Sequence, residues 1–206
     1  MKRIGLLFVA TTVFILSGCA LNQRAQIEAL GKFNYDVTSV QNMRVAGRDI
    51  NSFETDGGGV SLNSLPGIAM ALLTKDLPLE ATVNLQLSNP TSTLTKINEF
   101  KYLIEMGGKP LFEGSVNENI NLAQGQSMVV PLSFRANLFG VAKERGIENV
   151  LSDILTRKSD AFLALKIKPS IKIGGKNYFY PGYITVDKDF GKSISRSVTK
   201  GIDRIK

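Results

Sequence analysis

Hydrophobic and polar side chains alternate strictly along residues 81–88. A period of two places one set of side chains on a buried strand face and the other set in water. Asn89 and Pro90 follow, and we expect the strand to end there because proline cannot donate a hydrogen bond to the ladder. Residues 33–47 and 127–134 are also rich in β-branched and aromatic residues. The pattern predicts a chain built mainly of strands.

Two Gly-Gly pairs predict hairpins. Gly107-Gly108 interrupts residues 100–116, and a second pair at 174–175 interrupts residues 167–186. Glycine supplies the positive φ that a tight hairpin turn requires. Many short strands separated by turn signals indicate an immunoglobulin- or fibronectin-III-like antiparallel β-sandwich with one or two short helices. An antibody-type domain is excluded, since the chain has no tryptophan and a single cysteine.

Residues 146–158 break the strand pattern, because their apolar side chains recur at helical spacing. We expect a helix that packs across an open end or edge of the sheets, with a partner-binding helix as the alternative. A second short helix is expected within residues 68–79. The apolar positions of the first helix are Ile147, Val150, Leu151, Ile154 and Leu155.

The beginning of the chain has the pattern of an export signal. Residues 1–3 are Met-Lys-Arg, and residues 4–16 are mostly apolar. At 1.5 Å per residue this run gives roughly 20 Å of helix, too short for a bilayer core of about 30 Å. Leu16-Ser17-Gly18-Cys19 then resembles the lipobox of bacterial lipoproteins. In that family the thiol receives a diacylglycerol, the chain is cut before the cysteine, and the new amine is acylated.

The lipobox resemblance implies cleavage between Gly18 and Cys19 and a permanent membrane anchor, because two or more acyl chains hold a protein stably. Ala20, rather than aspartate, follows the cysteine. By resemblance to Gram-negative sorting, this favours the outer membrane, with the protein facing the periplasm. The alternatives are an ordinary secretory signal with a chance cysteine, or a buried core cysteine.

We therefore divide the chain into four parts. They are a signal peptide with an N-terminal signal helix (1–18), a lipidated spacer (19–32), the sandwich (33–190) and a basic tail (191–206).

Positive charge is concentrated near the end of the chain. Residues 157–206 carry 12 basic and 4 acidic side chains, whereas residues 19–156 carry 11 and 14. In the tail, basic residues recur every four positions opposite an apolar face, as in a helix that lies on an anionic membrane surface. Solvated strand lysines, a frayed terminus and a docked helix are the alternatives. The tail residues proposed to contact the membrane are Lys192, Arg196, Lys200 and Arg204.

The residue types used for most catalysis are scarce. The chain has no histidine, which removes the commonest general base and metal ligand. Its one cysteine is assigned to lipid. Ser197-x-x-Lys200 lacks the companion motifs of penicillin-recognising enzymes. We expect no enzyme, metal, cofactor or nucleic-acid partner, although a hydrolase that uses distant carboxylate pairs stays an alternative.

Residues 83–134 present a definite order of features. An alternating strand ends in Asn-Pro, a strand with a tyrosine leads to a Gly-Gly turn, and a short strand ends in Glu-Gly. A polar turn and an apolar strand with a proline follow. These landmarks are Asn89-Pro90, Tyr102, Gly107-Gly108, Glu113-Gly114, residues 124–126 and Pro131. This order resembles the late-embryogenesis-abundant type 2 family, which includes the water-stress and hypersensitive-response (WHy) domain.

The resemblance covers roughly residues 33–190 and implies a small β-sandwich associated with desiccation and stress tolerance. Related domains have been proposed to bind lipid. No catalytic residue carries over, and Asn89 and Pro90 carry over as a structural motif. We expect a non-enzymatic envelope lipoprotein that protects against stress or stabilises the envelope. A lipid-binding module, with an acyl groove between the sheets or under helix 147–157, and an accessory subunit of an envelope complex are the alternatives.

Overall fold

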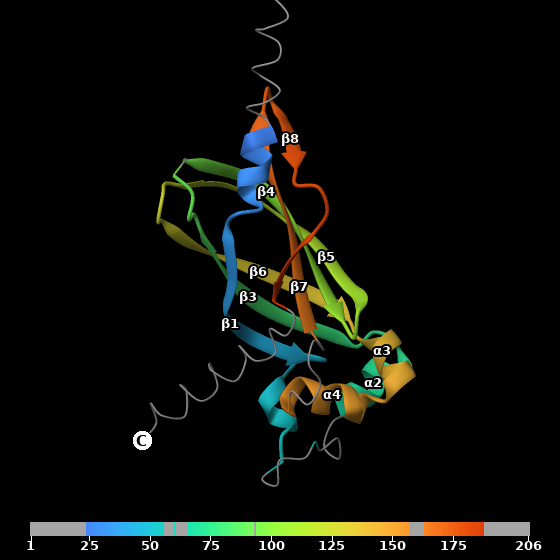
Figure 1. Ribbon diagram of the computed structural model, residues 1–206. Helices are drawn as coiled ribbons and strands as arrows, with labels where there is room; N and C mark the ends of the chain where they lie inside the picture. Colours follow the sequence, from blue (N-terminus) through green and yellow to red (C-terminus); the bar gives the residue numbers. More distant parts are fainter. Residues whose placement is uncertain (1–23, 56–59, 61–65, 93, 157–162, 188–206) are drawn as a thin grey trace, which may run out of the picture.

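Two antiparallel sheets pack against each other in the computed structural model, which describes residues 24–55, 60, 66–92, 94–156 and 163–187 (Figure 1). The first sheet has the strand order β2-β1-β3-β6, comprising Arg48–Asp49, Asn34–Val45, Pro78–Ser88 and Ser127–Asn137. The second has the order β5-β4-β7-β8, comprising Lys109–Leu122, Thr95–Met106, Leu163–Ile173 and Lys176–Phe179. Strand β9 (Ile184–Asp187) also pairs with β7. The predicted β-sandwich is thereby confirmed.

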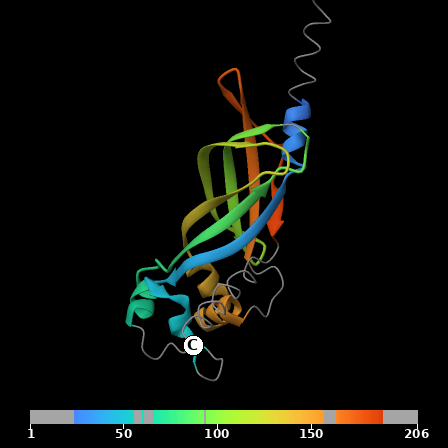
Figure 2. The ribbon, with the colours of Figure 1, turned by 90° about the vertical axis from the view of Figure 1, so that its left-hand side faces the viewer.

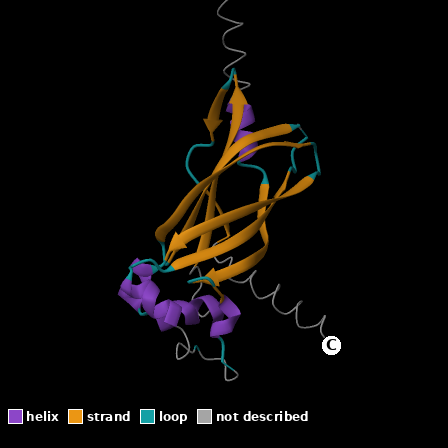
Figure 3. Cartoon of the chain, turned by 180° about the vertical axis from the view of Figure 1, so that it is seen from behind, coloured by secondary structure: helices purple, strands orange, loops and turns teal. Residues whose placement is uncertain are grey.

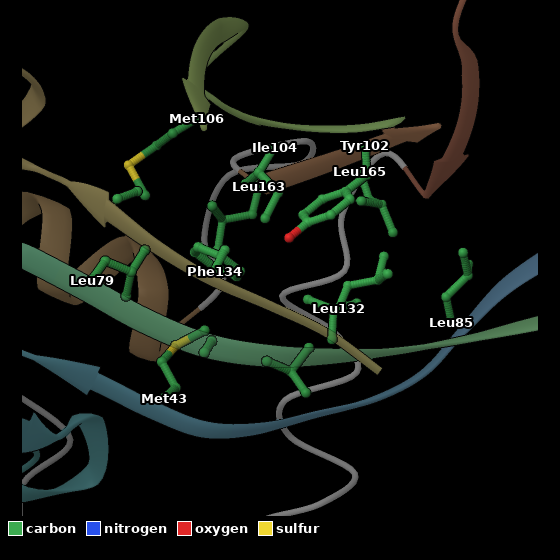
Figure 4. Close-up of a cluster of buried hydrophobic side chains, with 14 of the residues drawn as sticks. Met43, Leu79, Leu85, Tyr102, Ile104, Met106, Leu132, Phe134, Leu163 and Leu165 are labelled. Atoms are coloured by element: carbon green, nitrogen blue, oxygen red, sulfur yellow. The ribbon is translucent and has the colours of Figure 1, made fainter. Parts of the chain in front are cut away.

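The core lies between the sheets and is filled by alternate residues of the strands. In β3, the apolar set predicted from the period of two is buried, and the polar set is half-buried on the outer face. Figure 4 shows side chains of both sheets pointing toward one another, including Leu85 and Leu132 from the first and Ile104 and Leu165 from the second. The Tyr102 hydroxyl crosses this interface and donates to the Ser133 carbonyl over 2.8 Å.

Both predicted Gly-Gly turns join neighbouring antiparallel strands. Gly107 and Gly108 have φ of 58° and 76° and connect β4 to β5. Gly174 and Gly175 have φ of 55° and 84° and connect β7 to β8. L side chains rarely adopt these values, so the glycines fix the positions of both hairpins.

Short helices gather at one end of the sandwich, as two views agree (Figures 1 and 3). They are η1 (Ile50–Phe53), α2 (Pro66–Leu73), α3 (Phe139–Arg145) and α4 (Ile147–Thr156). α4 is the helix predicted from spacing, and it packs its apolar face into the core, with Val150 and Leu151 fully buried. α2 overlaps the stretch 68–79 expected to hold a short helix but begins two residues earlier, while η1 and α3 were not predicted.

Residues 24–30 form a further helix at the opposite end of the sandwich (Figures 1 and 2). Leu30 is fully buried in the core, and its carbonyl accepts a hydrogen bond from the Tyr35 hydroxyl over 2.7 Å. Ile27 packs against the same core. The helix is therefore fixed to the sandwich by its last turn. None of the helices among the described residues is long and apolar enough to cross a membrane.

A proline divides the edge of the second sheet. Pro169 lies in β7, and its carbonyl accepts a hydrogen bond from Tyr180 over 2.8 Å on the side where β8 pairs. Because proline has no N–H to continue the ladder, the pairing of β8 with β7 ends at Phe179. The chain pairs with β7 again from Ile184, as β9. The loop between them carries Tyr183 over the outer face of the sheet.

Candidate functional site

The sequence-predicted attachment and membrane-contact residues lie outside the described residues. They are Cys19, with its preceding Gly18, and the tail residues Lys192, Arg196, Lys200 and Arg204. Lipidation and membrane contact by the tail stay predictions. The described residues define what the sandwich between these two segments offers.

Asn89 holds the turn that ends β3. Its side chain is buried, its amide Nδ2 donates to the Leu122 carbonyl over 2.8 Å, and its Oδ1 accepts from both the Thr91 N–H and hydroxyl over 2.9 and 2.6 Å. Its backbone also bonds to Gln126 and Gly125 over 3.0 and 2.8 Å. One asparagine thus joins the β3–β4 loop to the β5–β6 loop, which is a structural role.

The apolar face of α4 packs directly against the core and does not cover a groove. Val150, Leu151 and Ile154 are at most 2% exposed and belong to the core cluster. The two hollows that we describe next, both formed by residues outside α4, lie elsewhere on the sandwich. The helix therefore closes its end of the sandwich.

The first hollow, which we call the N-terminal hollow, lies where helix 24–30 meets the second sheet. Its volume is about 340 Å³, and its walls come from that helix, the β3–β4 loop, the start of β4 and the end of β7. Leu94 and Ala29 contribute apolar surface, and Leu94 is 61% exposed. Lys96 and Lys172 also line it, and neither forms an ion pair with any residue among those described. The hollow thus combines apolar surface with unneutralised positive charge.

The second hollow, of about 680 Å³, is open and lies along β1, β3 and β6. Its charges form a row in the strand register, with Glu80 between Arg44 and Arg135. Arg135 pairs with Glu80 over 2.7 Å and with Asp76 over 3.5 Å. Arg135 is thus neutralised by two carboxylates, whereas Arg44 forms no ion pair among the described residues.

Lysines and aromatic rings meet on the outer face of the second sheet, forming what we call the lysine–tyrosine cluster. Lys101 and Lys168 are opposite each other in the β4–β7 register. The Lys101 ammonium lies 5.4 Å from the centre of the Phe179 ring, and that of Lys168 lies 5.9 Å from the Tyr183 ring. Each cation therefore faces a ring and not a carboxylate, at a distance where cation–π attraction is effective.

Tyr183 also donates a hydrogen bond to Glu113 over 2.8 Å. Desolvation raises the pKa of the Tyr183 phenol to about 12, and the hydrogen bond and negative charge of Glu113 contribute in the same direction. The phenol therefore stays protonated, and acts as a hydrogen-bond donor, throughout the physiological pH range.

Other perturbed groups are structural. Burial raises the pKa of Tyr35 and of Tyr102, and both hydroxyls donate to backbone carbonyls inside the fold. On the surface, the hydrogen bond from Lys109 lowers the pKa of the Glu144 carboxyl. Within the described part of the chain, no group of three or more potential ligands is placed to hold a metal.

Comparison with known proteins gives only distant likenesses. No family model matches the chain, and no curated protein matches it either. It is similar in structure to a protein from Archaeoglobus fulgidus, with 17% identity over 52% of this chain and 80% of that one and a TM-score of 0.34. A protein from Arabidopsis thaliana is 16% identical over 73% of this chain and 80% of that one, with a TM-score of 0.39. A protein described as late embryogenesis abundant is 14% identical over 89% of this chain and 91% of that one, with a TM-score of 0.31. These TM-scores are too low to support an argument, so the β-sandwich is assigned from the two sheets of the chain itself.

Proposed function

We propose that this chain is a non-enzymatic lipoprotein of the cell envelope, anchored through Cys19, with a sandwich of the late-embryogenesis-abundant type 2 kind. It stands on the periplasmic side of the outer membrane and acts through surface contacts, in protection against stress such as desiccation or in stabilising the envelope. The observation that carries the proposal is the short connection between the lipobox motif and a helix fixed to the sandwich.

Only four residues, 20–23, separate Cys19 from Arg24, the first residue of the described helix. An extended chain spans at most about 3.6 Å per residue, so the lipid anchor is within roughly 18 Å of Arg24. Buried Leu30 holds the helix to the end of the sandwich that carries the N-terminal hollow. An acylated Cys19 would therefore keep this end close to the bilayer and the end with α2, α3 and α4 away from it.

The outer face of the first sheet suits a role through contact with water or polar polymers. Its hydroxyls and amides bond to one another across strands, with Ser88 to Ser127 over 2.7 Å and Thr82 to Ser133 over 3.0 Å. Such groups keep their internal partners when water is withdrawn, so this face loses little hydrogen bonding on drying.

An accessory subunit of an envelope complex is a second candidate, supported by α2. This helix leaves Met70 and Leu73 61% and 78% exposed. Exposed apolar side chains side by side on a helix often mark a protein interface. A stoichiometric partner cross-linked through α2 would favour this candidate.

The anchoring claim is tested by fractionating cells that express the wild type or Cys19→Ser. We expect the wild type to pellet with outer membranes, to carry acyl chains on its N-terminal peptide, and to accumulate uncut in globomycin. Cys19→Ser should lose all three properties. A soluble, unlipidated wild type would overturn the proposal of an anchored lipoprotein.

The protective role is tested separately, by drying cells that lack the chromosomal gene and carry either version. We expect wild type to restore survival and Cys19→Ser, at equal abundance, to restore less. Survival unchanged by deletion of the gene would overturn the stress role while leaving the anchor intact.

A further inference from the structure

The N-terminal hollow is built from three segments that are far apart in the sequence. Helix 24–30, residues 94–98 and residues 171–172 line it together. At about 340 Å³ it is at the small end of the range for ligand sites, and it suits a headgroup with its glycerol but not a lipid with two full acyl chains. Its place at the helix-24–30 end of the sandwich is the one that a lipid on Cys19 would hold near the bilayer.

Two lysines elsewhere on the second sheet are neutralised by carboxylates. Lys166 pairs with Glu105 over 2.8 Å, and Lys109 pairs with Glu144 over 2.6 Å. Lys96 and Lys172, in contrast, are exposed and form no ion pair among the described residues. Two such ammonium groups beside one hollow attract an anion, and a phosphate diester can accept hydrogen bonds from both.

The backbone that carries Lys172 is held in place. Its N–H donates to the Asn98 side-chain oxygen over 3.0 Å, and the Asn98 amide donates to Asn119 over 2.6 Å. The start of β4, the end of β7 and β5 are thereby joined at the wall of the hollow. This lysine is presented from ordered strands, so little backbone ordering is required when an anion binds.

Apolar surface lies next to these charges. Leu94 is 61% exposed on the β3–β4 loop, and Ala25 and Ala29 of helix 24–30 also line the hollow. A hydrophilic anion gains no binding free energy from contact with this apolar surface, whereas the first carbons of an acyl chain bury apolar area against it. The combination is the one expected at the boundary between headgroups and hydrocarbon.

We propose that the N-terminal hollow binds the headgroup of an anionic phospholipid, with the phosphate between Lys96 and Lys172 and the adjoining carbons against Leu94. This inference rests on the proposed anchoring, which brings the hollow to the membrane. It assigns lipid contact to the sandwich end next to the anchor and not to α4.

The test uses the absence of tryptophan from the chain. Leu94→Trp gives the lipidated full-length protein, purified in neutral detergent, one fluorophore at the hollow. Met70→Trp places the same probe at an equally exposed position, 61%, at the other end of the sandwich. Each variant is titrated with short-chain phosphatidylglycerol, short-chain phosphatidylcholine and inorganic phosphate.

We expect saturable blue-shifted emission from Leu94→Trp with phosphatidylglycerol and none with phosphatidylcholine, and no shift from Met70→Trp. Lys96→Gln and Lys172→Gln should each weaken binding about fivefold, since a lysine contributes about 1 kcal/mol toward an anionic lipid surface. Lys143→Gln, an exposed lysine on α3, should leave it unchanged. Circular dichroism of each variant checks that it is folded.

Three results would overturn the inference: no saturation with phosphatidylglycerol, equal binding of phosphatidylcholine, or phosphate binding as tightly as the lipid. The last would indicate a site for free phosphate. The mass of the N-terminal peptide reports lipidation of Cys19 in the same preparation. A lipidated protein with no headgroup binding refutes this inference alone, and an unlipidated protein that binds the headgroup refutes only the anchor.

Discussion

Replacing Asn89 with alanine should weaken the fold more than any comparable change on the outer faces of the sheets. The side chain is 1% exposed and makes three hydrogen bonds, one to the Leu122 carbonyl and two from Thr91. Alanine removes all three and leaves their buried or half-buried partners without this contact. A net contribution of about 1 kcal/mol per bond, with a larger cost for a buried group left unsatisfied, gives a loss of about 2–4 kcal/mol.

The assay is urea unfolding followed by far-ultraviolet circular dichroism, since the chain has no tryptophan. With a slope of about 2 kcal/mol per molar urea, the midpoint of Asn89→Ala should fall by about 1–2 M while the slope is unchanged. Asn84→Ala is the matched control. That amide is half-buried on the outer face of β3 and donates one hydrogen bond to Ser39 over 2.8 Å, so its loss should cost about 1 kcal/mol or less.

Asn89→Asp separates the two halves of the interaction. It keeps an acceptor for Thr91 but turns a carboxylate oxygen toward the Leu122 carbonyl, where the amide had donated. At neutral pH it should be at least as destabilising as Asn89→Ala, because a buried charge loses hydration. Equal midpoints for Asn89→Ala and Asn84→Ala would refute the idea that this side chain joins the two loops.

Three further outcomes follow from the second sheet. Gly114→Ala should cost about 1–3 kcal/mol by thermal unfolding, because its Cβ would lie 2.6 Å from Cζ of Tyr102, directly opposite in the register; an unchanged midpoint would contradict this. Lys168→Glu should raise the free energy of unfolding by about 0.2–1 kcal/mol in low salt, because the new carboxylate can pair with Lys101. A lower free energy of unfolding would show that the lost ring contact of Lys168 contributes more than the new ion pair. Absorbance should show Tyr183 ionising near pH 12, and since its folded pKa is raised above 10, its contribution to stability is complete below pH 10 and falls as the pH rises toward 12; ionisation near 10 would contradict the burial argument.

The strands and turns with strong local signals were predictable because their information lies within a few residues. The period of two fixed β3, the Gly-Gly pairs fixed two hairpins, and helical spacing identified α4. β2 and η1 are too short for any period to appear, with two and four residues. The bulge in β1, where Asn42 has a φ of 53°, depends on pairing with β3, which no local pattern encodes.

The N-terminal hollow could not be predicted for the same physical reason. Its lysines come from the start of β4 and the end of β7, and these positions become neighbours only when the strands pair. Leu94 follows the Asn-Pro turn and resembles an ordinary loop residue in the sequence. An apolar loop residue two positions before a lysine was the one available signal, and it is too common to identify a site by itself.

The excess of basic residues after position 156 shows how sequence charge differs from surface charge. Lys166 is neutralised by Glu105, and Lys168 faces the ring of Tyr183. Lys172 is left to attract an anion at the hollow, together with Lys96, which comes from a part of the chain with net negative charge. Since strand pairing brings Lys96 and Lys172 to one hollow, lipid contact should follow those two side chains and not the overall charge of the segment.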